Sequence, residues 1–138
     1  MATSDSTGAN SGHAQSQLQS LIAGGVDVRL LKTVPSYTDG STDLDSYEID
    51  TDTTNYSPVT VAEADWTVST GETFSDAATL ENANVIDFGT ADSDWGQVVA
   101  VAVDNGTNFF MSDDPSGDIT SGTEVSIDAN AITHTLGN

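Results

Sequence analysis

The sequence has no cysteine and only two basic residues, Arg29 and Lys32, in 138 positions. The absence of cysteine excludes disulfides, thiolate nucleophiles and cysteine-ligated metal sites. Because no basic patch can displace the counterions of phosphates, we expect no nucleic-acid partner. The longest apolar stretch, Val98–Val103, is far too short to span a bilayer, so we expect no membrane partner. Residues 1–8 have neither a basic nor an apolar stretch, so we expect no signal peptide.

Acidic residues dominate instead: 22 Asp and Glu give a formal net charge of −20. Self-repulsion of such a chain opposes compaction in dilute buffer. At about 1 M salt the Debye length falls to roughly 3 Å, and most of this repulsion is screened. The acids are dispersed among apolar runs of strand length, unlike the blocks of a disordered tail. We therefore interpret the chain as a folded domain adapted to molar salt, as in a halophilic archaeon or its viruses. The alternative is an ordinary acidic protein, but such proteins usually keep a balancing set of lysines.

The hydrophobic pattern predicts an all-β fold with one short helix. Residues 1–24 are typical of a polar N-terminal arm, in which residues 14–23 could form a short helix that Gly24 and Gly25 end. Residues 25–138 are expected to form the main domain. Its strands are predicted at 26–31, 58–62, 66–68, 85–88, 98–103, 109–111, 123–127 and 131–136.

About eight strands with almost no helix indicate an antiparallel β-sandwich of jelly-roll type. We expect the acidic segments 35–57 and 70–82 to be loops outside it. The segment Val98–Val103 is apolar at every position, which predicts a central strand covered on both faces. Asn105-Gly106 predicts a two-residue type I′ turn into the partner strand.

Strict alternation along the central strand predicts which residues share a face. It places Val99, Val101 and Val103 on one side. It places Val98, Ala100 and Ala102 on the other. The predicted structural core comprises Trp95, Val99, Val101, Val103 and Phe109, with Trp95 closing one end just before the strand.

Two motifs in the second half of the chain carry a family resemblance. Asp94-Trp95-Gly96 leads into the apolar strand, and Gly122-Thr123-Glu124 precedes the last two strands. Together with the strand at 26–31, these motifs resemble a widespread family of small virion proteins of tailed viruses, often described as tail-fibre-like. The resemblance covers roughly residues 26–136. It implies a β-sandwich that assembles on the virus particle in symmetric clusters, and it implies no catalytic residues.

The sequence offers little for catalysis. Its two histidines, His13 and His134, lie near the termini, and no Gly-x-Ser-x-Gly elbow is present. Pairs of carboxylates such as Asp92 and Asp94 are expected by chance in so acidic a chain. We therefore expect a protein that is not an enzyme and that has no cofactor.

Acidic clusters make structural cations the remaining candidate ligands, because Ca²⁺ and Mg²⁺ prefer oxygen ligands. The candidate ligands are Asp39, Asp43, Asp45 and Glu48 in one predicted loop, and Asp113, Asp114 and Asp118 in another. Neither set has the spacing of an EF-hand. Diffuse hydration by Na⁺ and K⁺ explains both sets equally well.

Three classes of function remain open. The favoured one is a capsid decoration or turret-base subunit, located in the virion after assembly in the host cytoplasm. The second is a tail, baseplate or fibre-associated protein, and the third is a cellular β-sandwich module that binds carbohydrate or protein. A tail fibre usually needs a long shaft, which favours the first class.

The expected partners follow from the exposed edges of a β-sandwich, which this chain has few lysines to guard. We expect the chain to bind itself, as a closed trimer, and to bind the major capsid protein or other virion proteins. Residues 1–24 are expected to reach across to a neighbouring subunit or to a shell protein.

Overall fold

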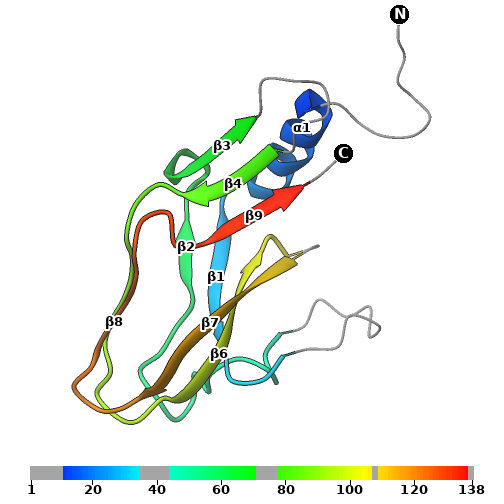
Figure 1. Ribbon diagram of the computed structural model, residues 1–138. Coiled ribbons are helices and arrows are strands. Elements are labelled where there is room, and N and C mark those ends of the chain that lie inside the picture. The colour runs from blue at the N-terminus through cyan, green and yellow to red at the C-terminus, as the bar shows by residue number, and fades with distance from the viewer. Residues whose placement is uncertain (1–10, 35–43, 71–77, 107–108, 137–138) are drawn as a thin grey trace, which may run out of the picture.

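The computed structural model describes residues 11–34, 44–70, 78–106 and 109–136. Over these residues the chain is mostly antiparallel β structure with one helix (Figure 1), which confirms the coarse prediction of an all-β fold. The elements are α1 (Ser11–Ile22), β1 (Val26–Leu31), β2 (Val59–Val61), a short 3-10 turn (Glu63–Asp65), β3 (Trp66–Thr70), β4 (Ala78–Asn82), β5 (Ile86–Thr90), β6 (Gly96–Asp104), β7 (Phe109–Ile119), β8 (Glu124–Ile127) and β9 (Thr133–Leu136).

The strands form three antiparallel sheets. The main sheet has the order β2-β1-β6-β7, a second has the order β3-β4-β9, and β5 pairs with β8. Strand β4 was not predicted, since residues 70–82 were expected to form a loop. That expectation is wrong for Ala78–Asn82, which pairs on both sides, with Ala78 and Leu80 buried. The apolar alternation of this strand is short and its flanks are polar, which concealed it in the sequence.

Helix α1 packs against β3 and β4 at one end of the molecule (Figure 1). It begins three residues before the predicted start, and its buried residues Ala14, Leu18 and Ile22 recur at the helical spacing of four. The N–H of Gly25 donates to the carbonyl of Ile22 (2.9 Å), and Gly24 has φ +81°, a left-handed conformation that favours glycine. The helix therefore shares the main core with the sheets. No helix among the described residues is long and apolar enough to cross a membrane.

Strand β6 is central in the main sheet, but its side chains do not alternate strictly. A register shift against β7 between Val98 and Ala100 marks a β-bulge. The extra residues lie in β7, where residues 114–116 stand opposite Val99 alone, and the strict alternation of β6 is interrupted at this point. As a result Val98 joins Val101 and Val103 in the main core, whereas Val99 packs with Ala100 and Ala102 on the opposite face. The predicted placement of Val98 and Val99 is therefore wrong.

The connection between β6 and β7 also differs from the prediction. Asp104 pairs with Phe109, so residues 105–108 lie between the strands and the predicted two-residue turn is wrong. The N–H of Gly106 (φ +90°) donates to the Asp104 carboxylate at 2.8 Å. This hydrogen bond favours a wider loop beginning at Asp104, whereas residues 107–108 lie outside the described part.

Residues 44–56 belong to the packed structure, contrary to the prediction that 35–57 lies outside it. The N–H of Lys32 donates to the carbonyl of Tyr47, and the N–H of Ile49 donates to that of Leu30. This segment thus continues the main sheet beside β1, beyond the end of β2. Ile49 and Tyr56 are buried in the main core. Residues 35–43 lie outside the described part.

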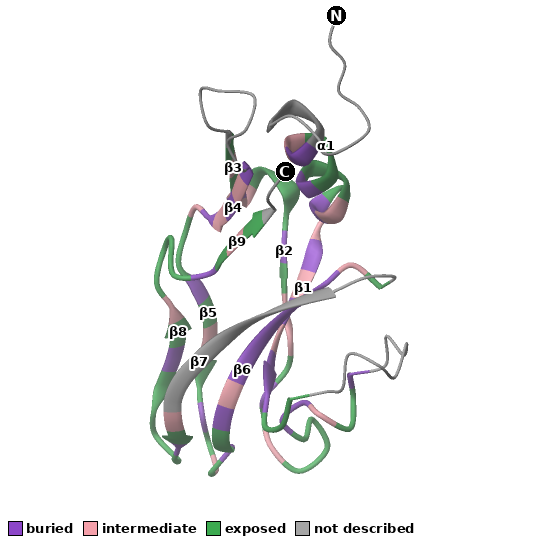
Figure 2. Cartoon of the chain, turned by 45° about the vertical axis from the view of Figure 1, so that its right-hand side comes forward, coloured by how far each residue is buried: buried purple, intermediate pink, exposed green. Residues whose placement is uncertain are grey.

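Apolar side chains form two clusters, one on each face of the main sheet. The main cluster joins α1 to all three sheets, and Figure 2 shows buried residues running along β1 and β6. The second cluster comprises Leu31, Leu44, Ala100 and Ala102, with Tyr47 and Val99 partly buried against it. Of the predicted core residues, Trp95, Val101 and Val103 lie in the main cluster and Val99 lies in the second. The side chain of Phe109 lies outside the described part.

Candidate functional site

Arg29 is the centre of the largest described cluster of charged side chains. Its Nη1 donates to Glu48 (3.0 Å), its Nε to Asp104 (3.2 Å) and its Nη2 to Asp27 (3.4 Å). Glu48 and Asp104 are only 3% and 6% exposed. Burial lowers the pKa of Arg29, but the charges and hydrogen bonds of Glu48 and Asp104 outweigh it, so this pKa is raised above its ordinary value. The guanidinium therefore remains charged.

The strand register explains why these groups meet. In β1 the apolar residues Val26, Val28 and Leu30 face the main core, so Asp27 and Arg29 face the other way. Asp104 lies directly opposite Asp27 in β6. Glu48 reaches the same face through its bridge to Leu31.

Each carboxylate in this cluster uses both oxygens. The second oxygen of Asp27 accepts from the Thr60 hydroxyl (2.7 Å), and that of Asp104 accepts from the N–H of Gly106. The second oxygen of Glu48 accepts from the Tyr56 hydroxyl. One guanidinium and three hydrogen-bonded carboxylates thus fasten β1, β6 and the segment around Glu48 together. Buried charges of this kind are tolerated only when they are paired in this way.

Tyr56 connects the charged cluster to an aromatic cluster in the main core. Its hydroxyl donates to Glu48 and accepts from the N–H of Leu30 (2.9 Å). Leu30 lies in β1 between the residues that pair with β2 and the residue that bridges to Glu48. Its ring stacks on Phe88 (6.0 Å between centroids) and meets the edge of Trp95 (5.4 Å). Burial, followed by the hydrogen bond to Glu48, raises the pKa of Tyr56. The phenol therefore stays protonated and continues to donate.

Replacement of Tyr56 by phenylalanine tests the contribution of this hydroxyl, because the ring contacts with Phe88 and Trp95 are kept. We expect a loss of about 1–3 kcal/mol in the free energy of unfolding, since the N–H of Leu30 and one oxygen of Glu48 lose a buried partner. Urea unfolding in molar salt measures it. An unchanged midpoint would show that water replaces the hydroxyl without cost.

The first set of predicted cation ligands is not brought together among the described residues. Asp39 and Asp43 lie outside the described part. Asp45 is exposed, whereas Glu48 is buried and has both oxygens engaged by Arg29 and Tyr56. Glu48 is therefore occupied by protein donors.

The second set lies in strand β7 and not in the predicted loop. The side chains of Asp113 and Asp114 lie outside the described part, and Asp118 is exposed near the end of the strand. Within the described residues, no three Asp, Glu, His or Cys side chains are grouped so that they could hold a metal ion. Of the two histidines, His134 is half-buried in β9, where burial lowers its pKa. The side chain of His13 lies outside the described part.

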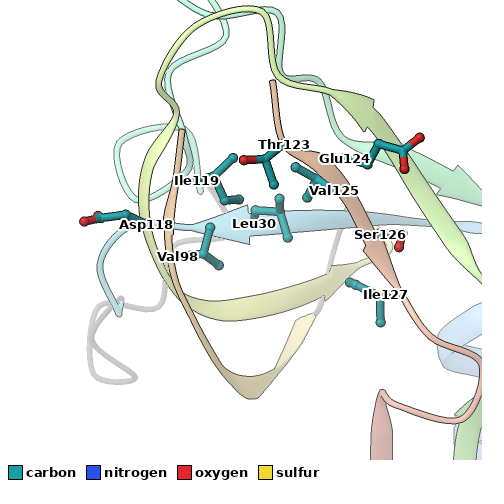
Figure 3. A pocket seen from close by; sticks show the side chains of 9 residues that line it. All are labelled: Leu30, Val98, Asp118, Ile119, Thr123, Glu124, Val125, Ser126 and Ile127. Atoms are coloured by element: carbon teal, nitrogen blue, oxygen red, sulfur yellow. The ribbon is translucent and has the colours of Figure 1, made fainter. Parts of the chain in front are cut away.

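A pocket of about 140 Å³ opens between β8 and the main sheet (Figure 3). Leu30 and Val98 line it from the main sheet, and Val125 and Ile127 line it from β8. Ile119 at the end of β7 contributes a fifth apolar side chain. The carboxylates of Asp118 and Glu124 lie on opposite margins and point away from the apolar centre (Figure 3). These apolar side chains are themselves largely buried, and polar groups make up most of the accessible lining of the pocket.

Neither the charged cluster around Arg29 nor the pocket beside β8 was identified from the sequence. Arg29 was counted as a charge, but its three partners come from positions 2, 19 and 75 residues away. An arginine in a strand whose other residues, apart from Asp27, are apolar was the available signal, because such a residue needs acidic partners when it is buried. The pocket draws on β1, β6, β7 and β8, and no local pattern indicates it.

Comparison with known proteins finds no matching family model, no similar curated protein and no similar solved structure.

Proposed function

We propose that this chain is a non-enzymatic structural protein of a halophilic tailed virus, a capsid decoration or turret-base subunit that binds the head shell as a homo-oligomer. The observation that carries the proposal is the distribution of charge. One of the two basic residues is used inside the fold, where Arg29 pairs with Asp27, Glu48 and Asp104. The remaining surface carries a large excess of acids with Lys32 alone to balance them, a composition that suits molar salt.

The virion assignment is supported by the motifs Asp94-Trp95-Gly96 and Gly122-Thr123-Glu124. Trp95 is buried against Tyr56, and its indole N–H donates to Asn55 (2.8 Å). Gly96 has φ +89° and Gly122 has φ +92°, so both glycines have left-handed backbone conformations that other residues rarely adopt. These motifs therefore act as structural elements, in keeping with the resemblance to small virion proteins.

The same proposal includes a β-sandwich of jelly-roll type as the finer description of the fold. The pairing of β5 with β8, and Val98 and Val125 lying in one apolar cluster, support two packed layers. Exposed edges of such layers favour assembly with copies of the chain and with shell proteins.

Copy number in purified particles tests the proposal. Quantitative gel densitometry against the major capsid protein should give a ratio near that of a shell component. A ratio typical of a tail would replace the head assignment with the tail or baseplate alternative. Absence from purified particles would overturn the virion assignment and favour the cellular binding module.

A further inference from the structure

Helix α1 is joined to β1 by a very short connection, residues 23–25, which we call the hinge. When extended, a connection of this length can span about 10 Å. Gly24 (φ +81°) and Gly25 (φ +95°) are both left-handed, and the N–H of Gly25 donates to the carbonyl of Ile22 (2.9 Å). The hinge therefore turns α1 back onto its own chain through a tight turn that glycine adopts more readily than other residues.

The docking of α1 depends on one apolar stripe. Ala14, Leu18 and Ile22 are buried in the main core, and the helix packs against β3 and β4 (Figure 1). The helix contains no Asp, Glu, Lys or Arg. Near the hinge, the side-chain amide of Asn105 donates to the carbonyl of Leu21 (3.1 Å). Because all copies of the chain are identical, the surface under α1 fits the α1 of a second copy through the same contacts.

The surroundings of the hinge leave room for a second chain. A hollow of about 270 Å³ lies directly beside it, lined in part by Gly24, Asp27, Asp104 and Asn105. Glu63 is also close, since it accepts from the N–H of Gly24 (3.4 Å). An extended hinge can pass through this hollow, but it brings the acids of two copies together.

We propose that copies of this chain assemble by exchanging α1, so that each helix packs against β3 and β4 of a neighbouring copy. The hinge is then extended and lies in the hollow beside it. This inference rests on the homo-oligomer of the proposed function and names the element that joins its copies. Each copy gives one helix and receives one, so the assembly closes on itself.

The hinge and the acids beside it decide the balance between the closed chain and the exchanged assembly. The buried contacts of α1 are the same in both, so they favour neither. A short hinge favours exchange, because it has little freedom to turn the helix back. Repulsion between the acids beside the two hinges opposes exchange, and at about 1 M salt, with a Debye length of roughly 3 Å, it is largely screened. We therefore expect exchange to strengthen with salt.

Gly24→Ala tests the hinge, because it disfavours the left-handed turn and not an extended connection. A Cβ at Gly24 would meet no atom within 4 Å outside its neighbours in the chain, so the substitution acts through the backbone conformation. In sedimentation velocity of the full chain in about 2 M NaCl, the dissociation constant of the oligomer should fall at least about tenfold. A substitution that strains the closed chain should thus strengthen association.

Gly122→Ala is the matched control. Gly122 is also left-handed (φ +92°), and a Cβ there would also meet no atom within 4 Å. It lies between β7 and β8, far from α1 in sequence. We expect this variant to lower the melting temperature without changing the dissociation constant. An unchanged dissociation constant in Gly24→Ala, or an equal decrease in both variants, would overturn the proposal.

Subunit exchange distinguishes a shared helix from a contact between outer surfaces. Oligomers labelled with donor or acceptor dyes through an added Ser121→Cys, the natural chain having no thiol, are mixed and followed by energy transfer. Leu18→Ala weakens the docking of α1 and should speed the mixing at least about tenfold. Val85→Ala shortens an exposed valine and should leave the rate unchanged. Equal rates in Leu18→Ala and wild type would show that α1 stays on its own chain.

These outcomes separate the two levels of the account. Wild-type and Gly24→Ala chains that both stay monomeric at high concentration in molar salt contradict the homo-oligomer itself. A wild-type oligomer that responds to neither Gly24→Ala nor Leu18→Ala contradicts only the exchange of α1.

Discussion

Replacing Arg29 by alanine is expected to lower the free energy of unfolding by about 3–5 kcal/mol, because it leaves buried carboxylates without their cation. Glu48 and Asp104 are both nearly inaccessible, and both accept hydrogen bonds from the guanidinium. Arg29→Lys keeps the charge but loses the planar fork that reaches three carboxylates. We expect it to fall between alanine and wild type. Urea unfolding measures the free energy of unfolding of all three proteins in about 2 M NaCl, where the Debye length is even shorter than the roughly 3 Å at 1 M.

Gln19→Glu is the matched control for charge. Gln19 is exposed in α1, and this change alters the net charge by the same single unit as Arg29→Ala. An exposed substitution of this kind should stay within about 0.5 kcal/mol of wild type. If Arg29→Ala were as mild as this control, the charged cluster would contribute nothing to stability.

Replacing Val101 by aspartate is expected to abolish folding. Val101 is 3% exposed and packs in the main core, so the substitution buries an unpaired charge. We expect insoluble protein, or soluble protein with neither a cooperative melting transition nor a strand-type circular dichroism spectrum.

Val99→Asp separates the observed packing from strict alternation. Alternation puts Val99 and Val101 on one face, whereas the structure places Val99 against the second cluster, where it is partly buried. We therefore expect Val99→Asp to fold with a lowered melting temperature, because its carboxylate can reach water. Equal loss of folding in both variants would show that the two faces of β6 are buried alike.

Strand positions were predictable where apolar residues form clear runs. The predicted strand at 26–31 matches β1, and the central position of β6 followed from its continuous apolar sequence. The irregular pairing of β6 with β7 was not predictable, because it depends on the register between the two strands. Strand β4 and the buried residues of 44–56 were missed because polar neighbours interrupt their patterns. In both cases tertiary packing, and not local preference, decides which apolar residues are buried.

The candidate sites were less predictable than the strands. The acidic residues around 39–48 were grouped because they are close in sequence, yet Glu48 pairs with Arg29 in β1 and Tyr56. Asp104 was not singled out from the sequence, yet one of its carboxylate oxygens binds Arg29 and the other accepts from the N–H of Gly106. Both roles depend on contacts between segments that only the fold brings together.

The central claim is that this chain folds and assembles as a structural subunit in molar salt. Sedimentation velocity across a NaCl series, with circular dichroism on the same samples, tests it most directly. We predict a folded oligomer in about 2 M NaCl and loss of assembly and structure near 10 mM, where the Debye length is roughly 30 Å and the net charge of −20 is poorly screened. A folded monomer with the same spectrum and sedimentation coefficient at both ends of the series would contradict the account.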